Sequence, residues 1–162
     1  MKVIHELEPI YYKDSKILIL GSIPSVKSRE EGFYYAHPQN RFWKVIAKVY
    51  EENVPNTIDE KKEFLRRNKI ALWDVLASCN IESSSDASIK NVKVNNIRKI
   101  IKQSNIEKIY TTGKKAYEIY QKKVFPKTKI PAVYLPSTSP ANASFHYEEL
   151  VEKYEVIKKE IS

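Results

Sequence analysis

Four short apolar runs rich in β-branched residues recur along the chain and predict four strands. They lie at Lys16–Leu20, Ile70–Val75, Ile106–Thr111 and Ala132–Leu135. The stretches between them carry apolar residues at helical spacing. Strands that alternate with helices form a mostly parallel sheet that is covered on both faces. The pattern therefore predicts an α/β fold, a three-layer α/β/α domain with a four-stranded parallel sheet.

Amphipathic patterns between these runs predict five helices. The first would begin after Asn40, where residues 42, 45, 46 and 49 share one apolar face. Thr57 and Glu60 have the spacing of a capping box and predict the start of the second helix. The apolar positions of the other three lie within residues 97–101, 117–124 and 150–157. No repeat or linker interrupts the pattern, so we expect residues 1–162 to form a single domain.

Composition agrees with one globular domain. The chain has 162 residues, of which 42% are hydrophobic and 30% charged. No apolar run approaches the ~20 residues that a membrane span needs. Acidic residues near the N-terminus are not typical of a signal peptide. We therefore expect a cytoplasmic protein that does not interact with membranes.

The net charge of +8 favours a polyanionic partner, because binding of phosphates by basic residues releases counterions. Many lysines could instead only solvate helix faces, and the composition does not decide between these explanations. The positions of some basic residues favour nucleic acid as the partner, since four of them cluster around the segments at residues 21–25 and 36–43. These are Lys27, Arg29, Arg41 and Lys44.

The residues that usually hold metals and cofactors are scarce. Cys79 is the one cysteine, which excludes an internal disulfide and a four-thiolate iron–sulfur cluster. The histidines His5, His37 and His146 lack metal-ligand spacing. Three glycines and the absence of a phosphate-loop signature disfavour dinucleotide binding. We therefore expect neither a metal nor a cofactor.

In a parallel sheet of this kind, ligands bind beyond the carboxyl ends of the strands. The candidate loops are residues 21–40, 74–80, 113–114 and 137–143. Asn40, at the end of the first loop, has two interpretations from the residues alone. It is a preferred N-cap for the helix that follows. Alternatively, its side-chain oxygen could orient a water molecule for catalysis, and its dipole could stabilise developing positive charge.

Two motifs at opposite ends of the chain carry a family resemblance. They are Ala36-His-Pro-Gln-Asn-Arg-Phe-Trp43, preceded by Tyr34-Tyr35, and Ser137-Thr-Ser-Pro-Ala-Asn-Ala143. Together they resemble the uracil-DNA glycosylase superfamily, and within it the hypoxanthine-DNA (deoxyinosine) glycosylases. The resemblance implies a uracil-DNA-glycosylase-like fold. It also implies a catalytic role for Asn40, because those enzymes use the Asn at the matching position.

Three departures from the uracil-specific pattern weaken an assignment to uracil. A further segment after the first strand, Gly21-Ser-Ile-Pro-Ser25, has Ile23 where the mismatch-specific relatives have a catalytic Asn. It also lacks the Asp of the strongest uracil enzymes. Ser137 stands where uracil-specific enzymes have a His. The resemblance therefore implies hypoxanthine, the deamination product of adenine, as the preferred base.

Aromatic and polar residues near these motifs could bind an extruded base. Tyr35 is the preferred stacking platform, with Tyr34 and Ser22 as further contacts. Asp74, at the end of the second strand, matches the position that reads the base edge in uracil-specific relatives. Its carboxylate could accept the N1–H of hypoxanthine but not bond the N1 of adenine. It could equally cap the segment that follows.

Several residues could contact the flanking phosphates or enter the gap left in the base stack. The expected DNA-binding set is Ser25, Lys27, Arg41, Ser137, Ser139, Pro140, Ala141 and Asn142. Serine-proline loops are also common turns, so the C-terminal motif alone is weak evidence.

Together with these residues, the resemblance implies a monofunctional DNA glycosylase that flips out hypoxanthine and hydrolyses its N-glycosidic bond to leave an abasic site. No lysine lies where it would form a Schiff base. The partner would be double-stranded DNA with a deaminated base, bound by a monomer. Two alternatives stay open: a mismatch-specific uracil or thymine glycosylase, and a non-catalytic protein that binds damaged or single-stranded DNA.

Overall fold

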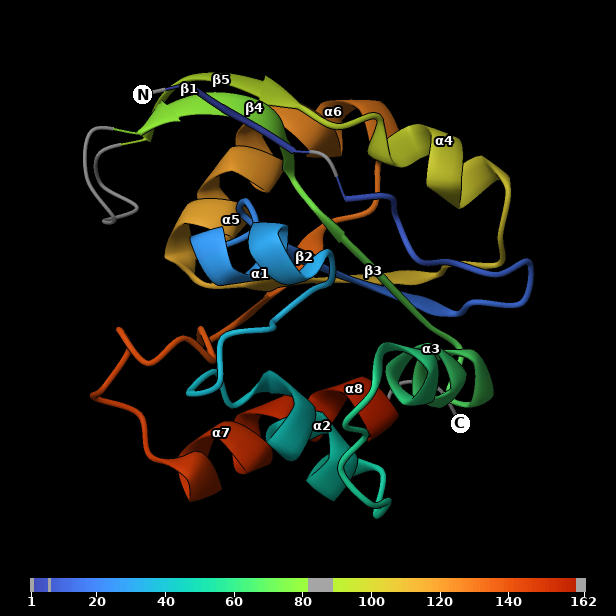
Figure 1. Ribbon diagram of the computed structural model, residues 1–162. Helices are drawn as coiled ribbons and strands as arrows, with labels where there is room; N and C mark the ends of the chain where they lie inside the picture. Colours follow the sequence, from blue (N-terminus) through green and yellow to red (C-terminus); the bar gives the residue numbers. More distant parts are fainter. Residues whose placement is uncertain (1, 6, 82–88, 160–162) are drawn as a thin grey trace.

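The computed structural model describes residues 2–5, 7–81 and 89–159 (Figure 1). Four parallel strands form the central sheet in the order β3-β2-β6-β7. Gly21, the last residue of β2, lies beside Asp74, the last residue of β3. The predicted four-stranded parallel sheet is confirmed, with strand ends that differ by two residues at most from those expected. The bounds are Ile17–Gly21 for β2, Ile70–Asp74 for β3, Lys108–Thr112 for β6 and Ala132–Leu135 for β7.

Helices cover both faces of this sheet, and two hydrophobic clusters fill the space between the layers. Side chains alternate along a strand. Ile17 and Ile19 of β2 are therefore buried in one cluster, and Leu18 and Leu20 in the other. The first cluster includes residues of α2 (Phe42–Val49), α3 (Ile58–Arg67), α7 (Tyr147–Tyr154) and α8 (Val156–Lys159). The second includes residues of α4 (Ile97–Lys102), α5 (Lys114–Ile119) and the π-helical η2 (Tyr120–Val124). The three-layer α/β/α arrangement is thus confirmed, and Figure 1 shows α4 and α6 (Phe125–Thr128) across the sheet from α2 and α7.

A second, three-stranded antiparallel sheet was not predicted. Its strands are β1 (Lys2–Ile4), β4 (Leu76–Ile81) and β5 (Ile89–Val94), in the order β1-β4-β5. Only Val75 separates β3 from β4, so the sequence pattern merges two strands of different sheets. β1 has three residues and β5 carries two lysines, which weakens the apolar alternation that reveals a strand. This sheet brings the N-terminal residues beside the end of β3.

The predicted helix starts are largely observed. The Thr57 side chain accepts from the Glu60 amide, and Glu60 accepts in return from the Thr57 amide, which confirms the capping box. Tertiary context altered two other elements: the expected 117–124 helix changes to π geometry at Tyr120, and the last helix divides at Glu155. The short helix α1 (Val26–Glu31) was not predicted. None of the helices in the described residues is long and apolar enough to cross a membrane.

Candidate functional site

Asn40 lies two residues before the first residue of α2, and its side chain joins the start of this helix to a distant segment. Asn40 Oδ1 accepts a hydrogen bond from the Phe42 amide at 2.9 Å and another from the Thr138 hydroxyl at 2.8 Å. An amide oxygen has two lone pairs, and both are used here. The expectation that Oδ1 holds a water molecule is therefore not supported. The Nδ2 group is the end of the amide that remains for a substrate or a water.

Thr138 is the residue that sequence reasoning missed at this position. It is 1% exposed, which makes its hydroxyl a buried donor with a fixed partner. Its carbonyl oxygen also accepts the Arg41 amide at 3.1 Å. Thr138 lies inside the C-terminal motif, so its place in the sequence was a usable signal. Its contact with Asn40, 98 residues away, was not visible there.

Arg41 anchors the loop after β7. Its guanidinium donates to the carbonyl oxygens of Phe145, Ser139 and Asn142. Three backbone acceptors hold the side chain in a partly buried position. The charge is therefore directed into the loop, whereas we expected Arg41 to bind DNA phosphates. Its observed role is to connect the start of α2 to the loop at residues 137–143.

Within this loop the polar groups satisfy one another. Ser137 Oγ accepts from the Ser139 amide at 3.1 Å, and Ser139 Oγ accepts from the Ala141 amide at 3.2 Å. Asn142 Nδ2 donates to the Ser137 carbonyl at 2.9 Å, so this amide stabilises the loop from within. Pro140 and Ala141 are exposed at its tip. The two serine hydroxyl protons and the exposed tip are what the loop can offer to DNA.

Tyr35 has an unusual backbone and a stacked ring. Its φ of 55° lies in the left-handed region, which is uncommon for an aromatic residue and strained. One ring face packs on Phe42 at a centroid separation of 3.9 Å and an interplanar angle of 12°. The hydroxyl lies 3.4 Å from Thr112 Oγ1. Burial raises the pKa of the Tyr35 phenol, which keeps it neutral at physiological pH. A base could stack only on the ring face opposite Phe42.

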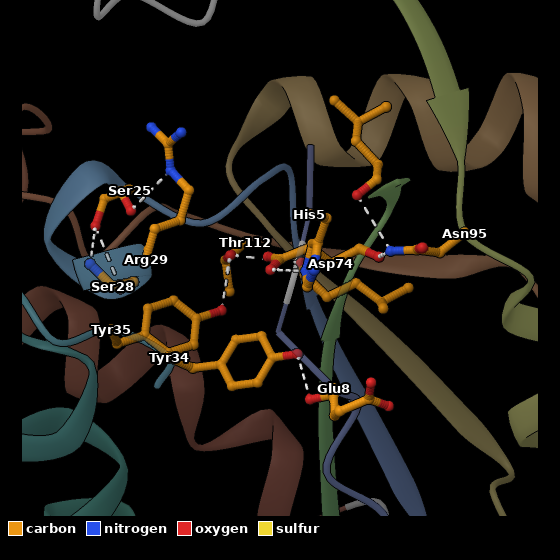
Figure 2. Close-up of polar contacts among 12 residues, drawn as sticks. His5, Glu8, Ser25, Ser28, Arg29, Tyr34, Tyr35, Asp74, Asn95 and Thr112 are labelled. Atoms are coloured by element: carbon orange, nitrogen blue, oxygen red, sulfur yellow. Dashed lines mark hydrogen bonds and ion pairs between the residues drawn. The ribbon is translucent and has the colours of Figure 1, made fainter. Parts of the chain in front are cut away.

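Tyr34 does not join Tyr35 at the site. It is 2% exposed, and its hydroxyl donates to the Glu8 carbonyl at 2.8 Å. Its own carbonyl accepts from Trp43 Nε1 at 3.1 Å. Figure 2 shows the Tyr34 hydroxyl directed to Glu8, whereas the Tyr35 hydroxyl points to Thr112. Tyr34 is therefore a core residue, whereas we expected it to contact the base.

Asp74 is buried at the end of β3 and pairs with His5. Its Oδ2 lies 2.8 Å from His5 Nε2, and the two side chains are 5% and 1% exposed. Burial raises the pKa of the Asp74 carboxyl, and hydrogen bonding from His5 opposes that shift. Neither expected role is observed, because the carboxylate neither caps the next segment nor faces solvent. No sequence signal linked His5 to this position.

Gly21 lies at the centre of this buried group. A Cβ at that position would come within 2.5 Å of Asp74 Oδ1 and 3.5 Å of the Tyr35 hydroxyl. The contact with Asp74 is too short for a Cβ, so a side chain here would displace the Asp74 carboxylate, whereas the distance to Tyr35 is an ordinary contact. Figure 2 shows Asp74, His5, Thr112 and Tyr35 in one neighbourhood.

The remaining expected residues lie on or before α1. Ser25 caps this helix by accepting from the Ser28 amide at 3.1 Å. Lys27 is ion-paired with Glu31 at 3.0 Å near the surface. Ser22 is partly exposed, and its carbonyl accepts from the Leu76 amide at 3.0 Å. Ser22 and Lys27 are thus accessible to a ligand, and the Ser25 side chain caps α1.

Comparisons with known proteins agree in family and in fold. Residues 9–160 match the family model described as the uracil DNA glycosylase superfamily. A protein of Methanosarcina barkeri named hypoxanthine DNA glycosylase is 34% identical over 139 residues, which is 83% of this chain and 85% of that protein. A protein of the same name from Methanosarcina acetivorans is 34% identical over 137 residues, 82% of this chain and 84% of that protein.

A solved structure is similar over nearly the whole chain. It is a solution NMR structure of a Methanosarcina acetivorans protein described as a candidate uracil DNA glycosylase. The TM-score is 0.81 at 28% sequence identity, with 98% of this chain and 99% of that chain covered. The fold is therefore shared with a known structure.

Proposed function

Because the chain belongs to the uracil DNA glycosylase superfamily and is a DNA glycosylase, we propose that it excises hypoxanthine from double-stranded DNA. Water would add to the anomeric carbon as the N-glycosidic bond breaks, which yields free hypoxanthine and an abasic site. The names of the two Methanosarcina relatives support this choice of base. Ile23 and Ser137, which replace residues of the uracil-specific pattern, support it as well.

The observation that carries the proposed mechanism is the pair of bonds on Asn40 Oδ1. With Oδ1 occupied by Phe42 and Thr138, the Nδ2 hydrogens are the functional end of the side chain. We assign Nδ2 the task of donating to the oxygen of the attacking water and fixing its position. Glycosidic cleavage passes through an oxocarbenium-like sugar, so a well-placed water can react without a strong base. Asn40 is then a catalytic residue, and Thr138 positions it.

In this proposal, the extruded base stacks on the face of Tyr35 opposite Phe42. Stacking of a base on an aromatic ring contributes about 1–3 kcal/mol and accepts any base. Asp74 is 3% exposed, so it supports the site through Gly21 rather than reading the base edge. Base choice would then depend on the shape formed by Gly21, Ser22 and Tyr35.

DNA contacts are assigned to the exposed groups of the site. Pro140 and Ala141 would enter the gap in the base stack, while the hydroxyls of Ser137 and Ser139 would donate to neighbouring phosphates. Lys27 on α1 would add a further phosphate contact by giving up its ion pair with Glu31 and pairing with the DNA backbone.

A panel of duplex oligonucleotides tests the proposal. Each would carry inosine, uracil or xanthine opposite one normal base, with alkali-labile cleavage measured under single-turnover conditions. We expect inosine to be cleaved fastest. Faster cleavage of uracil would establish the mismatch-specific alternative, and binding of damaged duplex without cleavage would establish the non-catalytic one.

A further inference from the structure

The positive charge of the chain is concentrated in one segment. Residues 89–129 contain twelve Lys and Arg but two Asp and Glu, a net charge of +10. The whole chain has a net charge of +8, so the other residues together carry −2. This segment includes α4 and α6, which lie across the sheet from α2 (Figure 1). The cations of α4 and α6 therefore lie on the opposite side of the sheet from α2.

Two adjoining hollows lie on this layer, and we call them together the α4–α6 groove. The first, of about 300 Å³, has the basic side chains of Arg98, Lys123 and Lys127 in its lining. The second, of about 330 Å³, has Lys99 and Lys102 together with Arg98. Asn96 and Arg98 line both hollows, and neither lining includes an acidic residue. The groove is thus an extended cationic track and not a single anion site.

The cations of the groove are not neutralised by the part of the chain that the structure describes. None of them forms an ion pair with a described carboxylate, whereas Arg66 and Arg67 on α3 are held by Glu63 and Glu52. Like charges four residues apart on a helix, as at Arg98 and Lys102, destabilise it. A polyanion in the groove would remove that repulsion.

The part of the groove formed by α6 is held by hydrogen bonds of the buried Tyr120 side chain. The Tyr120 side chain is fully buried and donates to the Ile130 carbonyl at 2.6 Å. Its hydroxyl also lies 2.8 Å from Thr128 Oγ1, and Thr128 lines the first hollow. Lys123 of η2 and Lys127 of α6 are exposed on the segment that these bonds hold in place.

We propose that the α4–α6 groove binds the phosphodiester backbone of duplex DNA away from the excised base. The proposal rests on the proposed function only for the choice of DNA as the polyanion. A track of flexible basic side chains neutralises successive phosphates without reading bases, so its contribution is independent of sequence and sensitive to salt.

The test is a triple variant, Arg98→Gln, Lys123→Gln and Lys127→Gln. A matched control removes the same charge from the other layer, through Lys48→Gln, Lys62→Gln and Lys153→Gln, which are exposed. The affinity for an undamaged duplex is measured against salt by fluorescence anisotropy. The groove variant should flatten the log–log slope by up to about 2.7 units, from about 0.9 per phosphate, and should lose at least about tenfold in affinity at low salt. The control should stay within about half a unit of the wild type.

Single-turnover excision from an inosine duplex, at saturating protein, separates this proposal from the proposed function. Excision by the groove variant should match the wild type, because its substitutions do not touch Asn40 or the loop at 137–143. An unchanged salt slope, or equal losses in the groove and control variants, would overturn the groove as a DNA-binding surface. Binding of inorganic phosphate that is lost in the groove variant, together with unchanged DNA affinity, would overturn it in favour of a small-anion site.

Discussion

Thr138 donates a 2.8 Å hydrogen bond to Oδ1 of Asn40 from 98 residues further along the chain. The same amide oxygen also accepts the Phe42 amide at the start of α2. Arg41, not Asn40, occupies the N-cap position of α2, and Asn40 accepts the Phe42 amide from one residue further back. These bonds and the proposed catalytic role do not compete, because the oxygen accepts the two hydrogen bonds and the nitrogen is left for chemistry.

Asn40→Ala should abolish most base excision while DNA binding stays nearly intact. Positioning of the water acts mainly in the transition state, so the loss falls on the chemical step. Asn40→Asp separates the two ends of the amide, since a carboxylate can still accept from Phe42 and Thr138 but has no hydrogen to donate. It should fold like the wild type yet lose activity. Single-turnover rates near the wild-type value for Asn40→Asp would show that Nδ2 is not the functional group.

Thr138→Val should lower the single-turnover rate by about tenfold, the effect expected for one hydrogen bond to a group held in place for catalysis. The substitution keeps the shape of the side chain and removes the donor. Thr138→Ser restores the hydroxyl and should recover most of the rate. The affinity for inosine duplex should be similar in both variants. Equal rates for the valine and serine variants would mean that packing, not the hydroxyl, matters at this position.

Arg41→Gln should destabilise the fold by about 2 kcal/mol, because hydrogen bonds from a charged group to the loop carbonyls are lost. Thermal unfolding would measure this, with Lys44→Gln as an exposed control three residues along. The salt dependence of DNA affinity should be unchanged by Arg41→Gln, since the guanidinium faces the loop. A slope that flattens by about one unit would return Arg41 to the phosphate-binding residues.

The buried Asp74 predicts a distinct pH dependence of stability. Its pKa in the fold is raised above the ordinary value of 3.8, mainly by burial. The folded state therefore binds the Asp74 proton more tightly than the unfolded chain does. The resulting contribution to folding stability is fully present below pH 3.8, and it is lost as the pH rises through the raised pKa of the folded state. Asp74→Asn removes this titration while an amide oxygen can still accept from His5. The variant should gain in Tm relative to the wild type as the pH rises through that window, and parallel Tm profiles would contradict the assignment.

The same Asp74→Asn variant tests base choice. Because Asp74 is buried beside Gly21, the variant's excision of inosine relative to uracil and adenine should match the wild-type preference. A weaker discrimination between hypoxanthine and adenine would show that Asp74 reaches the base edge after all.

The central sheet was predictable because its strands are buried on both faces and read as continuous apolar runs. The small antiparallel sheet was not, since β4 follows β3 almost directly and the apolar alternation of β1 and β5 is weak. Motifs located Asn40 and the loop at 137–143, but contacts between distant segments decided what each residue does. Arg41 was expected to bind phosphate, but its guanidinium donates to three loop carbonyls. Tyr34 was expected to contact the base, but it is buried and its hydroxyl donates to the Glu8 carbonyl. The pairing of His5 with Asp74 depends on the small antiparallel sheet β1-β4-β5, which the sequence pattern did not predict.

The bonds from Thr138 to Asn40 and from Arg41 to Ser139 and Asn142 couple the loop tip mechanically to the proposed catalytic amide. A duplex that presses on Pro140 and Ala141 therefore acts on the same unit that places the water. In the proposed mechanism, insertion into the strand gap and alignment at the sugar would be a single event. A free nucleoside cannot press on the loop, so we expect this coupling to favour a base held in a duplex over a free nucleoside.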